Sequence, residues 1–179
     1  DMIWDELETR LTQLAAEGLV RCRRTLDSSC GPEAVIDGRR LIAFCSNDYL
    51  GLANHPVLIA AVQAAASRWG VGSGASHVVS GHLRPHEELE QRLAAFVGRE
   101  RALYFTTGYM ANLAIAPALV ERNDAIFADR LNHASLIDAA QLARAEHIRY
   151  PHGDLATLAD RLQHSRARRK LILTDAVFS

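Results

Sequence analysis

The sequence predicts an α/β fold, with a mostly parallel sheet covered by helices on both faces. From residue 102 onward, short apolar segments of strand length alternate with segments of helical periodicity. Parallel strands require a crossover between them, usually a helix, so this alternation is typical of a parallel sheet. The chain has 179 residues, 49% hydrophobic and 23% charged, which suits a globular domain with a substantial core.

The first hundred residues predict helices, one hairpin and two loops. Leu7, Leu11 and Leu14 recur at helical spacing, so an amphipathic helix is expected over residues 3–25. The pair Asp37-Gly38 between apolar segments predicts a β-hairpin turn. The other elements expected here are a polar loop at 46–55, a helix at 56–69, a Gly- and Ser-rich loop at 70–83 and a helix from 85 to 97.

The second half of the chain carries the predicted sheet. Strands are expected at 102–105, 125–128, 147–150 and 171–174, with helices at 109–120, 135–145 and 155–162. In such sheets, ligands bind beyond the carboxyl ends of the strands. The segments that should form a site therefore follow the strands, at 106–109, 129–133, 151–154 and 175–179.

Two of these segments carry candidate chemistry. Thr106-Thr107-Gly108-Tyr109 opens a helix whose first N–H groups and dipole suit a phosphate, although an ordinary capped turn has the same pattern. His133 precedes the next helix and could be a catalytic base, a platform for ring stacking or a helix cap. The residues alone leave these alternatives open.

The Gly-rich segment Gly70–Ser76 is not a dinucleotide-binding fingerprint. It reads GxGxG rather than GxGxxG, and a helix precedes it where the fingerprint needs a strand. It fits either a flexible link or a loop whose backbone approaches a ligand closely.

Two histidines, His82 and His86, lie four residues apart beyond this loop. Pro85 separates them and no HExxH pattern is present, so the sequence predicts no metal site here.

Composition excludes several functional classes. The net charge of −1 gives no reason to expect a nucleic acid or a membrane as partner, and the basic run 166–170 is expected to be a solvated helix end. Cys22, Cys30 and Cys45 show no CxxC spacing, which favours a reducing, cytoplasmic compartment. Residues 1–10 do not resemble a signal peptide, and the longest apolar run, 113–120, is too short to span a bilayer.

Five segments together carry a family resemblance. They occur in the family's order: SNDYLGL (46–52) with His55-Pro56, GSGASH (72–77) with Ser80-Gly81-His82, TGYMAN (107–112), DRLNHASL (129–136) and DAVFS (175–179). Through them the chain resembles the α-oxoamine synthases, pyridoxal 5′-phosphate (PLP) enzymes with the aspartate-aminotransferase fold. The resemblance implies PLP fold type I, with an N-terminal helix and hairpin arm at 1–45 and the first part of the PLP-binding large domain at 46–179.

The family's cofactor contacts carry over by position. Gly108 and Tyr109 resemble the pair that holds the cofactor at the helix start. His133 resembles the catalytic imidazole that stacks on the pyridine ring near the substrate. Asp175 and Ser179 resemble further cofactor contacts, but Asp175 stands where Glu is often found, which leaves its direct contact open.

Three further positions resemble contacts with the substrate or the phosphate. Arg21, expected in the N-terminal helix, and Asn47 resemble substrate-binding residues, and a guanidinium suits a carboxylate or another anion. Ser76 resembles a phosphate-side contact. The resemblance implies a homodimer, in which Asn47 and Ser76 could serve the neighbouring subunit.

Within the family, the GSGASH and HASLID segments most resemble members that act in biotin biosynthesis. Those enzymes condense L-alanine with a pimeloyl thioester, on CoA or a carrier protein, and release CO₂. The alternatives are a sibling enzyme of the 2-amino-3-oxobutyrate CoA ligase or 5-aminolevulinate synthase type and, more remotely, a Rossmann-type nucleotide-binding domain. A non-catalytic binding domain is disfavoured because the leucine faces of the helices are expected to pack against the sheet.

One lysine limits what the chain can do alone. The implied chemistry needs a lysine that holds PLP as a Schiff base and then acts as a base. The single lysine, Lys170, is expected at the amino end of a strand, at the edge of the sheet opposite the ligands. We therefore expect the Schiff-base lysine, and the aspartate that pairs with the pyridine nitrogen, to lie outside this chain, which should be inactive by itself.

Overall fold

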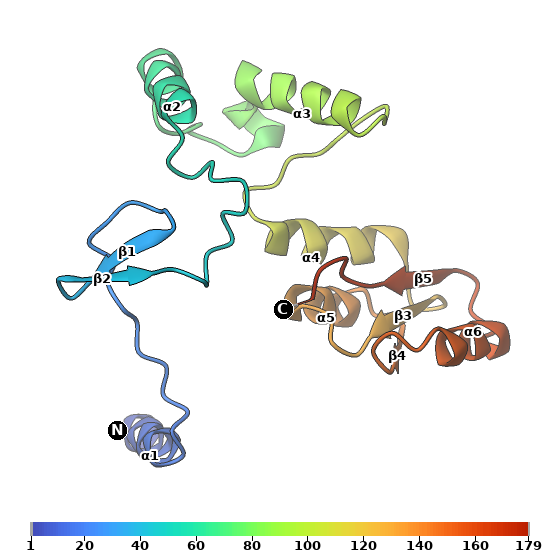
Figure 1. Ribbon diagram of the computed structural model, residues 1–179. Coiled ribbons are helices and arrows are strands. Elements are labelled where there is room, and N and C mark those ends of the chain that lie inside the picture. Colours follow the sequence, from blue (N-terminus) through green and yellow to red (C-terminus); the bar gives the residue numbers. More distant parts are fainter. Residues whose placement is uncertain (1, 179) are drawn as a thin grey trace. The chain divides into compact units, whose positions relative to one another are not determined.

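The computed structural model describes residues 2–178, which form two compact units that divide between Gly74 and Ala75. Each unit has its own elements (Figure 1). The first contains α1 (Met2–Ala16), β1 (Glu33–Ile36), β2 (Arg39–Ile42) and α2 (Pro56–Trp69). The second contains η1 (His77–Gly81), α3 (Arg84–Phe96), α4 (Gly108–Leu119), β3 (Ala125–Asp129), α5 (Ala134–Leu142), β4 (Glu146–Tyr150), α6 (Leu155–His164) and β5 (Lys170–Leu173). Among these residues, no helix is both long and apolar enough to cross a membrane.

Strands β1 and β2 form the hairpin that the sequence predicts. They pair antiparallel, with Ile36 opposite Arg39. Asp37 and Gly38 at the turn both have positive φ angles, 52° and 71°. A two-residue turn with positive φ at both positions is the type I′ geometry that matches the twist of a hairpin.

Helix α1 is shorter than predicted. It ends at Ala16 rather than residue 25, because Gly18 adopts a left-handed conformation with a φ of 68°. The N–H of Leu19 then donates to the carbonyl of Leu14 at 2.8 Å, which closes the helix as a Schellman motif does. Arg21 therefore lies beyond the helix, contrary to the prediction.

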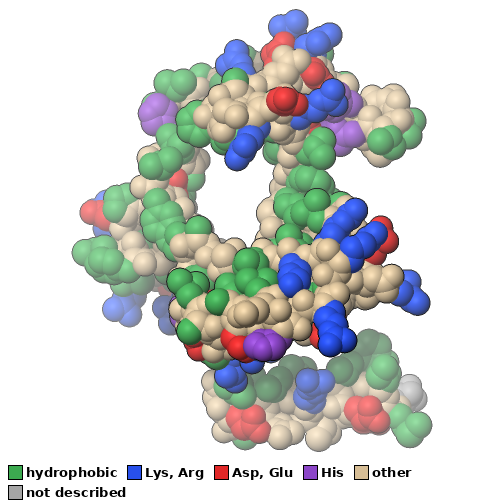
Figure 2. Space-filling model, turned by 90° about the vertical axis from the view of Figure 1, so that its right-hand side faces the viewer, with side chains coloured by type: hydrophobic (Ala, Val, Ile, Leu, Met, Phe, Trp, Pro, Cys, Tyr) green, Lys and Arg blue, Asp and Glu red, His purple; other side chains and the backbone are tan. Residues whose placement is uncertain are grey.

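The helices of the first unit keep their apolar side chains exposed. Neither α1 nor α2 buries a residue, and Leu7 and Leu11 are 45% and 59% exposed. Hydrophobic side chains are also plainly visible on the surface in Figure 2. The expectation that the leucine faces of the helices pack against the sheet therefore holds for Leu158 of α6 but not for Leu7 and Leu11 within the described residues.

The second unit contains the predicted parallel sheet. Its strand order is β4-β3-β5, and β3 pairs in parallel with both neighbours, with Phe127 opposite Ile148 on one side and Ile172 on the other. Every residue of β3 is buried. A strand covered on both faces is what an apolar segment such as AIFAD predicts.

Helices cover both faces of this sheet, as predicted. Because side chains alternate along a strand, Ile126 and Ala128 face one way and Phe127 faces the other. The first pair packs with α4 and α5, through Ala116, Ala139 and Ala140 among others, and Phe127 packs with Tyr150 and with Leu158 of α6. The small alanine side chains let α4 and α5 pack closely against each other.

Two local predictions are wrong. Residues 102–105 form no strand, because no described strand pairs with them, and the Tyr104 N–H donates instead to the Glu90 carboxylate at 2.9 Å. The expected loop at 70–83 contains the π-helical turn η1, where the Gly81 N–H donates to the Ser76 carbonyl at 2.9 Å.

The basic run 166–170 is partly built into the fold rather than merely solvated. The Arg168 guanidinium donates to the buried Asp124 carboxylate, at 3.1 and 3.3 Å. Asp124 also accepts the backbone N–H groups of Glu121, at 2.9 Å, and Arg169, at 3.1 Å. These bonds lower the pKa of Asp124 to about 2, and the bond from Arg168 has the largest effect. Burial acts in the opposite direction and would raise this pKa. Asp124 thereby ties the start of β3 to the start of β5.

Candidate functional site

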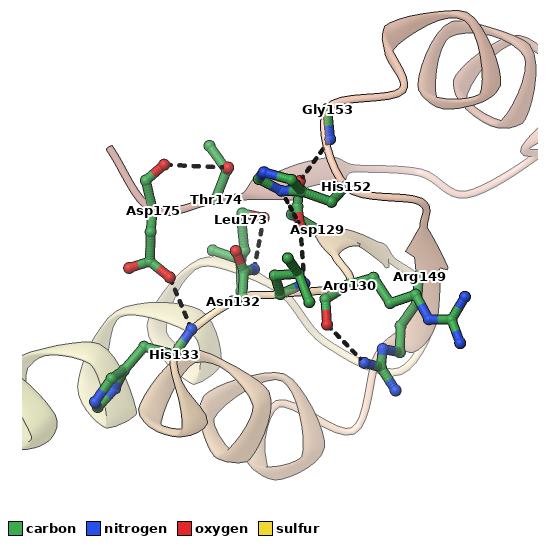
Figure 3. Close-up of polar contacts among 11 residues, drawn as sticks. Asp129, Arg130, Asn132, His133, Arg149, His152, Gly153, Leu173, Thr174 and Asp175 are labelled. Carbon is green, nitrogen blue, oxygen red and sulfur yellow. Dashed lines mark hydrogen bonds and ion pairs between the residues drawn. The ribbon is translucent and has the colours of Figure 1, made fainter. Parts of the chain in front are cut away.

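The segments that follow β3, β4 and β5 meet at the carboxyl edge of the sheet, as parallel pairing requires. Figure 3 shows His133, Asp175, Asn132, Asp129 and His152 in this region, drawn from all three segments. Sequence analysis pointed to these segments, and the structure brings them together.

His133 is the N-cap of α5. Its Nδ1 accepts the Ser135 N–H at 3.2 Å and lies 2.7 Å from the Ser135 hydroxyl, which in turn accepts the Asn112 side-chain amide at 2.9 Å. Since Nδ1 is an acceptor, the neutral ring carries its proton on Nε2. The helix-cap alternative for His133 is therefore confirmed, and the cap leaves Nε2–H available to a ligand.

Asp175 fixes the backbone beside this histidine. Its Oδ2 accepts the His133 N–H at 2.7 Å, which links the segment after β5 to the start of α5 (Figure 3). A carboxylate that accepts a backbone N–H at a helix start also benefits from the positive end of the helix dipole. The short aspartate arm is thus long enough to order the site through the backbone.

Tyr109 lies in the first turn of α4 with its ring edge-on to that of His133, at 6.5 Å between centroids and an angle of 78°. Its hydroxyl donates to Asp138 of α5, and this hydrogen bond is the main reason that the pKa of Tyr109 is raised. The bond joins α4 to α5 across the site.

The start of α4 has the features of an anion site. Thr107 caps the helix, because its hydroxyl accepts the Met110 N–H at 3.1 Å. The N–H groups of Gly108 and Tyr109 precede the first residues that can bond within the helix, so they are available to an anion. A side chain at Gly108 would meet no atom within 4 Å, so there is open space beside this backbone.

A buried aspartate that sequence analysis did not select holds the loops in place. Asp129, 3% exposed, accepts the Leu131 N–H at 2.9 Å, the His152 Nδ1 at 3.0 Å and the Gly153 N–H at 3.2 Å. Burial acts to raise its pKa, but the bonds from Leu131, Gly153 and His152 together lower it. The signal was available in the sequence: an aspartate ends one strand, and His-Gly follows the next.

Asn132 is a second residue that sequence analysis missed. Its amide nitrogen donates to the Leu173 carbonyl at 2.8 Å, while its buried Oδ1 has no partner among the described residues. Its bond to β5 sets the path of the chain just before His133. No local pattern distinguishes Asn132 from its polar neighbours, because its partner is a backbone group 41 residues away.

The contacts predicted for Arg21, Asn47 and Ser76 stay predictions. Arg21 and Asn47 are exposed residues of the first unit, and the Asn47 carbonyl accepts the Tyr49 N–H at 2.9 Å. Ser76 precedes η1 in the second unit. Ser179 lies outside the described residues, so its predicted contact stays a prediction.

Lys170 begins β5 beside Ala125, at the edge of the sheet opposite His133. Its Nζ donates to the Leu162 carbonyl at 2.6 Å. This is the position that sequence analysis expected.

Comparison with known proteins identifies relatives along the whole chain. The profile of the family described as "Aminotransferase class I and II" matches residues 39–179. An 8-amino-7-oxononanoate synthase of Herminiimonas arsenicoxydans is 66% identical over 178 residues, which is 99% of this chain and 46% of the relative. The enzyme of the same name from Azoarcus sp. is 65% identical over 175 residues, 98% of this chain and 45% of the relative. The chain thus spans about half the length of the curated relatives it matches.

Solved structures share the fold. A serine palmitoyltransferase from S. paucimobilis with bound PLP matches with a TM-score of 0.88 and 31% identity, over 99% of this chain and 46% of that one. An 8-amino-7-oxononanoate synthase from Francisella tularensis matches with a TM-score of 0.64 and 34% identity, over 75% of this chain and 37% of that one.

Proposed function

We propose that this chain, which belongs to the aminotransferase class I and II family, forms one half of a PLP-dependent acyltransferase that condenses L-alanine with a pimeloyl thioester. The products are 8-amino-7-oxononanoate, CO₂ and the free CoA or carrier protein, and the reaction belongs to biotin biosynthesis. The observation that carries this proposal is the 66% identity over 99% of the chain to a relative of that name.

The residues at the carboxyl edge of the sheet fit PLP. The free N–H groups of Gly108 and Tyr109 suit its phosphate, and the His133 imidazole suits its flat ring. When bound, PLP takes up electrons from the amino acid attached to it, so that the α-proton can leave and a carbon–carbon bond can form. A serine palmitoyltransferase with a similar fold holds PLP, which supports this cofactor.

In this proposal His133 stacks on the cofactor and holds a proton at Nε2, where it can donate to the substrate or to the ring. Ser135 fixes the tautomer, because its backbone N–H donates to His133 Nδ1 rather than Nε2, and Asn112 holds the Ser135 hydroxyl beside that nitrogen. Asp175 fixes the backbone from which the ring projects. Each contact lowers the freedom of the imidazole before the cofactor binds, which is how a site is preorganised.

The substrate contacts complete the proposal. Arg21 and Asn47 bind the carboxylate or thioester side of the substrates, and Ser76 binds the phosphate side in a cytoplasmic homodimer. Hybrid dimers test the shared site: a Ser76→Ala protein mixed with one that lacks the Schiff-base lysine should regain activity. Hybrid dimers that form but stay inactive contradict it.

Turnover of L-alanine with pimeloyl-CoA by the complete protein tests the function itself. We expect release of CoA and CO₂ with this pair, and much slower release with serine and palmitoyl-CoA, the pair that a serine palmitoyltransferase uses. Faster release with the second pair would instead support an activity like that of the serine palmitoyltransferase with the similar fold. The serine palmitoyltransferase with the similar fold is 31% identical to this chain, whereas the 8-amino-7-oxononanoate synthase of Herminiimonas arsenicoxydans is 66% identical.

A further inference from the structure

Three histidines that the proposed function does not use converge at the start of α3. His77 begins η1, His82 follows it, and His86 lies in the first turn of α3. One ring nitrogen of each lies within 4.8 Å of the other two. We propose that His77, His82 and His86 form a binding site for a divalent transition-metal ion, with Zn²⁺ as the ion that fits best.

The backbone of η1 explains why these rings meet. A π-helical turn places residues five apart on neighbouring positions, and such turns are frequent at functional sites. Gly81 closes the turn, and a Cβ atom there would lie 1.8 Å from the Ala75 carbonyl oxygen. Only glycine therefore allows the turn that brings His77 Nδ1 to 2.8 Å from His82 Nδ1. The spacing in the sequence relates only His82 and His86, because the turn that adds His77 is not predicted from local pattern.

A carboxylate orients the central ring in the way that metal sites require. His82 Nε2 lies 3.2 Å from Glu87 Oε2, and Glu87 also accepts the Gln91 amide at 2.7 Å. An ionised carboxylate only accepts, so His82 carries its proton on Nε2 and presents a lone pair at Nδ1. Metal-ligating histidines almost always donate their other N–H to such a partner.

The geometry suits a small tetrahedral cation. At Zn–N distances of 2.0–2.1 Å, two tetrahedral ligand nitrogens lie about 3.3 Å apart. The 2.8 Å between His77 and His82 must therefore widen, and the His86 ring, grouped with them only within 4.8 Å, must turn to reach the same ion. Imidazole nitrogen suits Zn²⁺, Cu²⁺ and Ni²⁺, whereas Mg²⁺ and Ca²⁺ prefer oxygen. His77 can move its proton to Nε2, because its side chain is exposed. Three imidazoles leave the fourth position to water.

His86 gives the proposal a specific consequence. Its Nδ1 accepts the Leu83 N–H at 3.0 Å. If His86 binds the metal through Nδ1, that lone pair is no longer available to the Leu83 N–H. If His86 binds through Nε2, the ring proton moves to Nδ1, and the resulting Nδ1–H faces the Leu83 N–H, which is also a donor. Metal binding through His86 must therefore free the Leu83 N–H by either route.

Zn²⁺ titration of the untagged complete protein tests the site, in competition with a chromophoric chelator and with the exposed cysteines alkylated. We expect one ion per chain. Glu87→Gln should weaken binding roughly 10- to 100-fold, as loss of an outer-shell partner does, and His77→Ala at least as much. His164→Ala is the matched control, because His164 also pairs with a carboxylate, Asp160, but lies outside the cluster.

Hydrogen exchange separates this site from scattered surface binding. With Zn²⁺, the Leu83 amide should exchange faster while the rest of α3 does not, and His77→Ala should abolish the change. The proposal is overturned if His164→Ala weakens binding as much as His77→Ala does. It is also overturned if Zn²⁺ binds but Leu83 exchange is unchanged, since the histidines would then act as separate surface ligands.

Discussion

The Asp175 carboxylate accepts the backbone N–H of His133 at 2.7 Å, and so joins the loop after β5 to the cap of α5. Asp175→Asn keeps the shape but removes the charge of this bond. Bonds to charged groups are worth about 1.5–3 kcal/mol, so we expect PLP affinity of the complete protein to fall about tenfold as the loop loosens. Absorbance titration with PLP measures this. Asp160→Asn, at an exposed carboxylate on α6, should leave the affinity unchanged.

The two roles of His133 can be separated by the choice of substitution. Asparagine is a good N-cap, so His133→Asn should keep α5 stable, whereas His133→Ala should cost about 1 kcal/mol of unfolding free energy. Both changes remove the imidazole, and both should weaken PLP binding about two- to tenfold if the ring stacks. If His133→Asn binds PLP as the unchanged protein does, the ring is only a cap.

The bond between Tyr109 and Asp138 should couple α4 to α5. Tyr109→Phe and Asp138→Asn should each lower the thermal midpoint, and the double variant should be no worse than the poorer single one, since both remove the same bond. The pKa of Tyr109 is raised in the folded state. The bond from the protonated Tyr109 hydroxyl therefore stabilises the fold fully below the pKa of about 10 that tyrosine has in the unfolded chain. This stabilisation is lost as the pH rises through the higher pKa of Tyr109 in the folded state. Additive losses would show that the two side chains act independently.

Acid should release the contact between Asp124 and Arg168. The folded pKa of Asp124 is about 2, below its usual value of 3.8. A lowered carboxylate pKa stabilises the fold above the unfolded pKa, and this stability is lost as the pH falls from 3.8 through about 2. Asp124→Asn should shift the acid-unfolding midpoint of the chain upward, as followed by circular dichroism. Asp5→Asn, on the exposed face of α1, should not shift it.

Periodicity predicted most elements because the local signals were strong. The first four residues of β3, AIFA, are apolar, and Pro56 begins α2. The pair Asp37-Gly38 strongly favours a tight turn. The failures have nonlocal causes. Residues 102–105 have strand composition but no described partner, and the turn η1 depends on the close approach of Gly81 to the Ala75 carbonyl.

The same distinction holds at the candidate site. His133 and Tyr109 could be selected because they stand in recognisable segments after strands or at helix starts. Asp129 left a local signal, an aspartate at the end of a strand, but its partner His152 lies 23 residues away, so neither segment alone shows the pairing. Asn132 left no such signal, because its partner is the Leu173 carbonyl, 41 residues away. Asp138 gave no signal of its own, since an aspartate within a helix is usually solvated.

The central claim is that this chain supplies the ring and phosphate contacts of a PLP site whose Schiff-base lysine lies elsewhere. The single lysine within the chain, Lys170, lies at the amino edge of the sheet and donates to the Leu162 carbonyl. The most direct measurement is borohydride reduction of the complete PLP-loaded protein, followed by peptide mapping. We predict one phosphopyridoxyl group per chain on a lysine outside residues 1–179, and none on Lys170. A stoichiometric label on Lys170, together with turnover of L-alanine and pimeloyl-CoA by the 179-residue chain alone, would contradict the claim.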